Sequence, residues 1–262
     1  MSAPAGETEQ DAAAARIQAD LLALGVRPGG VLLVHSSFKS LGGRTDPEAV
    51  IRGLLAALGP EGTLLLPALS YEHVTRRQPR FDQLRTPSNV GALPEYFRLR
   101  PGSLRSLHPT HSVCACGARA AEILSNHAGD RTPCGPGSPF HRLPEFAGQI
   151  LMLGCGLRPN TSMHAVEEQI GPPYLFSDPI DYILIPAGEP EVVRTYTPHG
   201  FRGWGQRYDR VEAVLRAPGL RTGPVLAAQA HLLEAAALWD AVLPALRRDP
   251  LAFVERDDSQ AH

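Results

Sequence analysis

One short segment of the chain combines a hydroxyl, an imidazole and two carboxylates. Residues 160–168 read NTSMHAVEE. If this segment is helical, Thr161, His164 and Glu167 follow one another at intervals of three and share one face. A carboxylate bound to one ring nitrogen fixes the tautomer of the imidazole and makes the other nitrogen a better base. The spacing is typical of a general base, but a solvent-exposed helix face often has the same residue types, so both interpretations stay open.

A second candidate segment is small, polar and rich in glycine. Residues 35–43 read HSSFKSLGG and follow an apolar run. Backbone N–H groups in such a loop approach a bound anion closely, which suits a pyrophosphate or the amides of a pantetheine chain. The phosphate-binding motifs Gly-x-x-x-x-Gly-Lys-Ser/Thr and Gly-x-Gly-x-x-Gly are absent. An ordinary polar loop after a strand is the alternative.

A third segment, residues 105–112, reads RSLHPTHS and places two histidines three residues apart. Zinc-binding helices usually carry His-Glu-x-x-His, and the intervening proline disfavours a helical pair. We therefore predict no metal site and expect these side chains to contact a cofactor. A metal-dependent hydrolase remains an alternative, and its ligands would be His108, His111, His164 and His199.

The four cysteines form no Cys-x-x-Cys pair. We expect reduced thiols that fill the core, since free cysteine behaves as a small apolar residue. A Cys–His acyl-transfer enzyme is the minor alternative. The residues concerned are Cys114, Cys116, Cys134 and Cys155.

The elements that must position these side chains include three apolar runs, at residues 30–35, 62–67 and 149–153. Runs without polar alternation are typical of buried strands in a largely parallel sheet. Asp46 and Pro47 mark a helix start, as N-cap and first helical residue, between the first two runs. The outline is a β-loop-α-β unit, in which ligands bind beyond the carboxyl ends of the strands.

The remaining elements complete one domain. A hairpin is predicted from 181–186 and 191–196, and a further strand from 112–116. Helical patterns cover residues 9–24, 89–99, 118–125, 207–215 and 225–246. We predict a single α/β domain over residues 9–256, with a mixed, partly parallel central sheet flanked by helices. Residues 1–8 are predicted to be a flexible tail.

Composition excludes several classes of protein. The chain has 262 residues, 43% of them hydrophobic, and a formal net charge of −2. It contains no block of Lys and Arg that would neutralise a series of phosphates, so we expect no nucleic-acid partner. No run of eighteen apolar residues predicts a membrane span, and the first thirteen residues lack the apolar core of a signal peptide. We expect a cytoplasmic monomer or homodimer that acts on a small molecule.

Five motifs in order carry a resemblance to a known family. They are the runs LLVHSSFKSLG, GTLLLP, SLRSLHPTHSVCACG and GQILMLGCGLRPNTSMHAVEE and the pair Ser138-Pro139. Together they resemble the aminoglycoside 3-N-acetyltransferases. The resemblance implies a family-specific α/β fold, distinct from the common N-acetyltransferase superfold. It also implies acetyl-CoA as cosubstrate and no metal.

The resemblance further implies roles for single residues. His164 and Glu167 would be the catalytic pair, and Thr161 would face the thioester carbonyl. The coenzyme A arm would be held by Ser36, Ser37, Leu41, Gly42, His108 and Ser112. The implied reaction transfers acetyl to the 3-amino group of the deoxystreptamine ring and confers antibiotic resistance. A non-aminoglycoside amine of a biosynthetic pathway is the alternative acceptor, and a coenzyme A-binding relative without catalysis is another alternative.

A polycationic acceptor favours a pocket rich in carboxylates. The candidate carboxylates are Glu72, Asp82, Glu168, Asp178 and Asp209.

Overall fold

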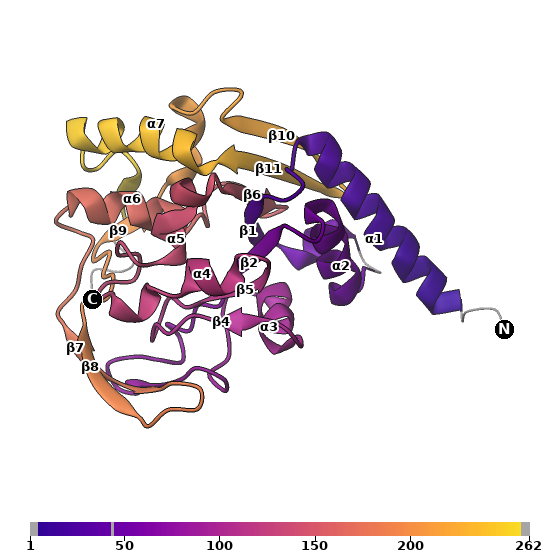
Figure 1. Cartoon of the computed structure of the whole chain (residues 1–262). Coiled ribbons are helices and arrows are strands. Elements are labelled where there is room, and N and C mark those ends of the chain that lie inside the picture. The colour runs from indigo at the N-terminus through magenta and orange to yellow at the C-terminus, as the bar shows by residue number, and fades with distance from the viewer. Residues whose placement is uncertain (1–4, 43–44, 258–262) are drawn as a thin grey trace.

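A seven-stranded sheet runs through the centre of the molecule (Figure 1). The computed structural model describes residues 5–42 and 45–257. The strand order is β10-β11-β6-β1-β2-β5-β4. The strands are β1 (Val31–Ser36), β2 (Thr63–Pro67), β4 (Leu104–Arg105), β5 (Val113–Gly117), β6 (Gln149–Leu153), β10 (Leu220–Val225) and β11 (Ala228–Glu234).

Parallel and antiparallel pairings divide this sheet. The central strands β6, β1 and β2 are parallel, and Leu33 is in register with Ile150 on one side and Leu65 on the other. Strands β5 and β4 on one flank, and β11 and β10 on the other, pair antiparallel. The prediction of a mixed, partly parallel sheet is confirmed.

Both faces of the sheet are covered by helices, which explains the apolar runs. Along β1, Leu32 and Val34 pack into one core cluster and Val31 and Leu33 into the other. Successive side chains point to opposite faces, so a strand buried on both sides needs no polar positions.

The two helical layers come from different parts of the chain (Figure 1). One face carries α1 (Ala5–Leu24), α2 (Pro47–Leu58) and α3 (Ala92–Leu99). The opposite face carries α4 (Ala120–Leu124), α5 (Pro139–Arg142), α6 (Ser162–Ile170) and α7 (Ala235–Arg248). The Asp46 side chain accepts a hydrogen bond from the Glu48 amide at the start of α2, as the N-cap prediction requires.

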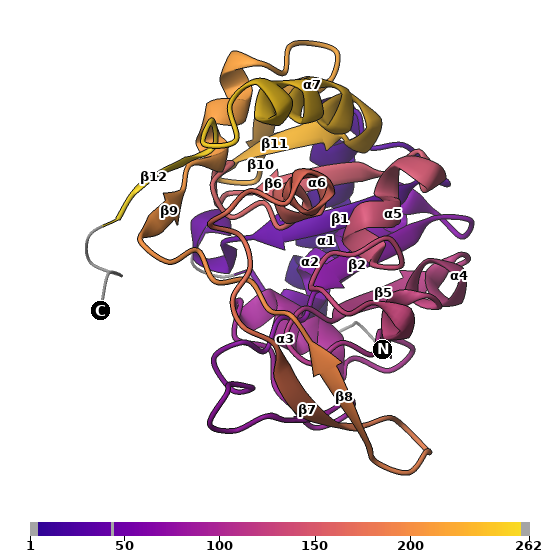
Figure 2. The same cartoon turned by 90° about the vertical axis from the view of Figure 1, so that its left-hand side faces the viewer.

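Two small sheets extend from this body. The first has the order β3-β7-β8 and contains β3 (Arg80–Asp82) and the predicted hairpin, β7 (Ile180–Ile185) and β8 (Val192–Tyr196). The hairpin projects beyond the main sheet (Figure 2). The second small sheet pairs β9 (Trp204–Gln206) with β12 (Val254–Arg256).

The predicted helix over residues 225–246 is wrong in its first half. Residues 220–234 form the antiparallel pair β10 and β11, and the helix α7 begins only at Ala235. The alanines of β11 have high helix propensity, but Ala228 and Ala230 are buried and alternate with the exposed Gln229. Pairing with β6 overrides the local propensity.

Two further boundaries differ from the predictions. The helix predicted over residues 207–215 is present as a 3-10 helix over Tyr208–Ala213. Helix α1 already begins at Ala5, so half of the predicted tail is helical, and residues 1–4 lie outside the described residues. No helix in the described part of the chain is long and apolar enough to cross a membrane.

Candidate active site

A cavity of about 490 Å³ opens at the carboxyl ends of the three parallel strands. His35 and Ser36 at the end of β1, Pro67 at the end of β2 and Cys155 after β6 all line it. This edge of a parallel sheet is the usual ligand site of α/β folds. The rest of the wall comes from Leu69, Tyr71, Val90, Pro94, His111, Arg158, Pro159, Asn160, Thr161, His164, His199, Gly200, Phe201, Gln206 and Tyr208.

A tight turn after β6 leads into the helix that carries the predicted base. Gly154 has φ 71°, and a Cβ there would lie 1.8 Å from the Ser40 hydroxyl, so only glycine fits. The Asn160 side chain then accepts a hydrogen bond from the Ser162 amide at the start of α6. Helix α6 therefore begins beside the cavity, and His164 lies in its first turn.

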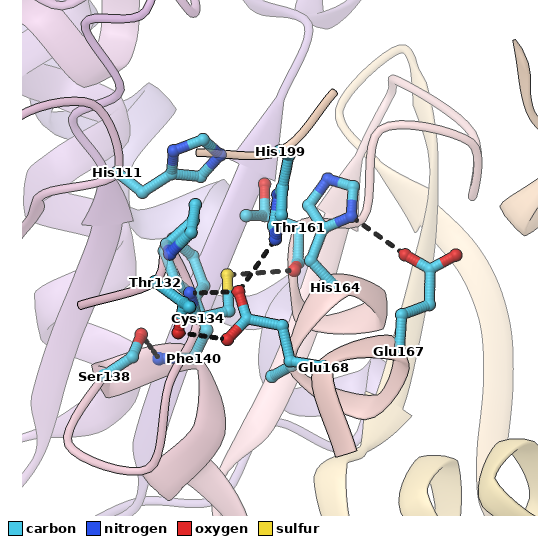
Figure 3. A network of polar contacts seen from close by, with 12 residues as sticks. His111, Thr132, Cys134, Ser138, Phe140, Thr161, His164, Glu167, Glu168 and His199 are labelled. Carbon is cyan, nitrogen blue, oxygen red and sulfur yellow. Dashed lines mark hydrogen bonds and ion pairs between the residues drawn. The ribbon is translucent and has the colours of Figure 1, made fainter. Parts of the chain in front are cut away.

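The predicted pairing of His164 with Glu167 is present. Nδ1 of His164 lies 3.1 Å from Oε2 of Glu167, and the two side chains share one face of α6 (Figure 3). Because a carboxylate only accepts, Nδ1 carries the hydrogen and Nε2 keeps a free lone pair. His164 lines the cavity, so the pair has the geometry of a general base.

Two tyrosines that the sequence did not suggest complete the pair. The Tyr208 hydroxyl lies 2.7 Å from Nδ1 of His164 and donates to Oε2 of Glu167 at 2.6 Å. The Tyr174 hydroxyl donates to the other carboxylate oxygen at 2.9 Å. Burial and the Glu167 carboxylate raise the pKa of Tyr208 well above its ordinary value, so the phenol stays a donor. The fully buried Glu167 thus has a donor on each oxygen.

The other predicted catalytic residue and one predicted cofactor residue also line the cavity. Thr161 lies at the start of α6, and the buried Ser36 hydroxyl has no hydrogen-bond partner within the described residues. Nε2 of the neighbouring His35 likewise has none there. Burial, together with His164, lowers the pKa of His35 to about 3, so this ring is neutral.

The remaining predicted cofactor residues do not line this cavity. Leu41 is buried in the core beneath α2, and with Gly42 it borders a separate hollow near α1. The Ser37 amide donates to the Leu153 carbonyl. His108 is buried and stacks on His127, with ring centroids 4.9 Å apart.

Ser112 has a structural partner instead. Its hydroxyl donates to the Ala68 carbonyl and accepts from Nε of Arg105 at 2.9 Å. Burial lowers the pKa of Arg105 to about 10, which leaves it charged at neutral pH. The Ser112 hydroxyl is thus part of an internal hydrogen-bond network, and its contact with the cofactor stays a prediction.

The candidate carboxylates are spread over other sites. Asp82 caps a turn, Asp178 pairs with Arg202, and Asp209 pairs with Arg207. Glu72 is exposed beside the cavity residue Tyr71. The Glu168 side chain is buried and is bound to His199 (Figure 3). Among the described residues that line the cavity, none is Asp or Glu.

The second carboxylate of α6 binds a second histidine. Nε2 of His199 lies 2.7 Å from Oε1 of Glu168, and the His199 and His164 ring centroids are 4.7 Å apart. Burial, followed by the neighbouring His164 side chain, lowers the pKa of His199 well below its ordinary value. From the sequence, Glu168 is a candidate acceptor carboxylate and His199 a candidate metal ligand. No pattern in the sequence predicts that the two side chains pair.

The alternatives of a metal-dependent hydrolase and of a Cys–His enzyme depend on the arrangement of the histidines and cysteines. No group of three or more His, Cys, Asp or Glu side chains in residues 5–42 and 45–257 is arranged to hold a metal ion. All four cysteines are free thiols. Burial raises the pKa of Cys155, the cysteine in the cavity wall, to about 11, so it is a protonated thiol at neutral pH.

Comparisons with known proteins agree with one another. Residues 33–247 match the family model described as aminoglycoside 3-N-acetyltransferase. Aminoglycoside N(3)-acetyltransferase IV of Salmonella sp is 35% identical over 92% of this chain and 89% of its own length.

Two solved structures with ligands are similar in fold. A mutant of aminoglycoside acetyltransferase AAC(3)-IVa in complex with apramycin has a TM-score of 0.74 and 32% identity, covering 91% of this chain and 93% of that one. The complex of AAC-IIIb with CoASH has a TM-score of 0.77 and 29% identity, covering 88% and 95%.

Proposed function

The chain belongs to the aminoglycoside 3-N-acetyltransferase family, and on this premise we propose that its cavity transfers acetyl from acetyl-CoA to an aminoglycoside amine. The proposed acceptor is the 3-amino group of the deoxystreptamine ring, and its acetylation confers resistance to the antibiotic. The observation that carries the proposal is the His164–Glu167 pair in the cavity wall. The cytoplasmic location predicted from the sequence is part of the same proposal.

His164 acts as the general base. Its Nδ1–H is held by Glu167 and Tyr208, so the lone pair on Nε2 is free to take a proton from the amine. The amine nitrogen forms the C–N bond with the thioester carbon as this proton moves to Nε2. The C–S bond breaks, and its electron pair leaves with sulfur as the thiolate. Glu167 stabilises the imidazolium that results.

Thr161 and Ser36 supply polar groups around the reacting centre. Acetyl-CoA supplies an activated acyl thioester when bound. The Ser36 hydroxyl and Nε2 of His35 are buried without partners in the described residues, and pantetheine amides would satisfy them. Thr161 would stabilise negative charge on the carbonyl oxygen, and one such donor contributes about 3 kcal/mol to the transition state.

A less cationic amine is the second candidate acceptor. It is favoured by the lining of the cavity, because the described wall contains Arg158 but no Asp or Glu. A polycation gains little from such a wall at close range. Acceptors that differ in the number of ammonium groups distinguish the two candidates.

The test is release of thiol from acetyl-CoA with a panel of aminoglycosides and simple amines. Wild type should acetylate at least one aminoglycoside, with the product identified by mass spectrometry. His164→Ala should lower kcat by about 100-fold or more, in line with the usual contribution of a general base. The exposed His73→Ala is the matched control and should match wild type. A His164→Ala enzyme as active as wild type would refute the assigned role.

A further inference from the structure

His199 lines the same cavity as the proposed base His164. Backbone hydrogen bonds hold the chain on either side of His199. It forms an antiparallel bridge with Phe176, and the Gly200 amide donates to the Leu175 carbonyl at 2.7 Å. The Ser177 amide donates to the Pro198 carbonyl at 2.9 Å. This segment therefore presents the His199 ring from a fixed position.

Glu168 fixes the orientation of that ring. Its carboxylate accepts from the Cys134 amide at 2.8 Å, from the Thr132 hydroxyl at 2.6 Å and from Nε2 of His199 at 2.7 Å (Figure 3). Both side chains of the His199–Glu168 pair are 6% exposed. A carboxylate that accepts from three sides leaves the hydrogen of His199 on Nε2.

The other ring nitrogen is left without a partner. Nδ1 of His199 is buried, and no described residue forms a hydrogen bond with it. Burial holds the pKa of His199 well below its ordinary value, so Nδ1 is a neutral acceptor. A buried acceptor without a partner is unfavourable, and a ligand N–H would satisfy it.

The reaction offers such an N–H. A free primary amine carries two N–H groups. One proton is lost to the base as the C–N bond forms, and the other stays on nitrogen in the product amide. Resting on the proposed function, we propose that His199, held by Glu168, accepts this second N–H and so orients the acceptor nitrogen beside His164. The two ring centroids are 4.7 Å apart and both residues line the cavity, so a nitrogen bound there lies near both imidazoles.

The test compares His199→Phe, which keeps an aromatic ring, with His199→Gln, which keeps a donor and an acceptor. His199→Phe should raise the KM for the amine about tenfold or more, since a hydrogen bond to the acceptor is lost. The KM for acetyl-CoA should stay within about twofold, because the contact is to the amine alone. His199→Gln should recover part of the loss.

His127→Phe is the matched control, because His127 is a buried histidine outside the cavity wall. It should leave both KM values within about twofold of wild type. If His199→Phe also leaves the amine KM unchanged, or raises both KM values equally, the inference is wrong. Wild type that acetylates no amine would instead refute the proposed function.

A second measurement uses wild-type protein, so it does not require that a variant folds. Wild type with 15N-labelled histidine, saturated with coenzyme A, is titrated with an amine that it acetylates. The unprotonated Nδ1 signal of His199 should shift upfield as the N–H is accepted, while the His127 signals stay in place. An unmoved Nδ1 signal at saturating amine overturns the inference.

Discussion

The Tyr208 hydroxyl donates to Oε2 of Glu167 at 2.6 Å, although 41 positions separate the two residues in the chain. The same hydroxyl lies 2.7 Å from Nδ1 of His164, and Tyr174 donates to the other carboxylate oxygen. A fully buried carboxylate held on both oxygens has one orientation, and it passes that orientation to the imidazole. The predicted pair of His164 and Glu167 thus belongs to a four-residue network that also contains Tyr174 and Tyr208.

Tyr208→Phe tests this network. The substitution removes one donor from Glu167 and one contact from His164, so the base is less well oriented. A hydrogen bond to a charged group is worth about 1.5–3 kcal/mol. We therefore expect kcat to fall about 10- to 100-fold with little change in the KM for acetyl-CoA. Steady-state kinetics with both substrates varied measures the two effects separately.

The matched control for that variant is Tyr182→Phe. Tyr182 is a buried tyrosine of β7 in a separate core cluster. Its loss should leave kcat within about twofold of wild type. An unchanged kcat in Tyr208→Phe would show that this hydroxyl is not required to orient Glu167 and His164.

Arg105→Gln tests a structural role for the hydrogen bonds around Ser112, a residue that is predicted to contact coenzyme A. The Arg105 guanidinium donates to the Ser112 hydroxyl and to the carbonyls of Ala68, Gln83 and Thr86. Leaving several buried acceptors without donors should lower the free energy of unfolding by about 3 kcal/mol or more. Urea denaturation measures the loss.

Two measurements distinguish the loss of buried hydrogen bonds from other effects of removing an arginine. Arg202→Gln removes an exposed ion pair with Asp178 and should change stability by at most about 1 kcal/mol. The folded fraction of Arg105→Gln should keep its kcat, since the guanidinium lies outside the cavity wall. A large loss of kcat without a loss of stability would contradict the structural role.

Local patterns explain what could be predicted from the sequence. The buried strands β1, β2 and β6 are continuous apolar runs, because helices cover both faces of the sheet. The pairing of His164 with Glu167 is a spacing of three on one helix, which needs no knowledge of the rest of the fold.

Contacts between distant segments explain what could not be predicted. Tyr208 follows the loop after β9, Tyr174 follows α6, and neither position has a periodic pattern that points to Glu167. The hydrogen bond from Arg105 to Ser112 likewise has no signal in the residue types alone. In β11, pairing with a neighbouring strand overrides the helix propensity of alanine.

Cys155→Ala tests whether the enzyme forms a covalent acetyl intermediate. Cys155 lines the cavity, but burial raises the pKa of its thiol to about 11, so little thiolate is present at pH 7.5. We expect kcat within about threefold of wild type for direct transfer. Mass spectrometry of wild type mixed with acetyl-CoA alone should show no added acetyl group. An acetylated Cys155 peptide, or an inactive variant, would favour the Cys–His alternative.

The buried histidines predict that acid destabilises the fold. Burial lowers the pKa of His127 to about 3, and burial together with His164 does the same for His35. An unfolded histidine titrates near 6.5, so below this pH the unfolded chain binds protons that the folded chain excludes. Stability is then lost as pH falls from about 6.5 towards 3. Burial also lowers the pKa of His108, His111 and His199, which adds to the effect.

Urea denaturation at pH 7.5 and pH 5.0 measures this dependence. Each buried neutral histidine contributes up to about 1.4 kcal/mol per pH unit once the unfolded ring is protonated. Burial raises the pKa of Glu168 and of Asp130, which acts in the opposite direction, but these two carboxyls are opposed by five histidines. His127→Gln removes one such group. It should reduce the change in the free energy of unfolding with pH by about the contribution of one histidine. Stability that is constant or higher at pH 5.0 would mean that these rings are protonated in the folded protein.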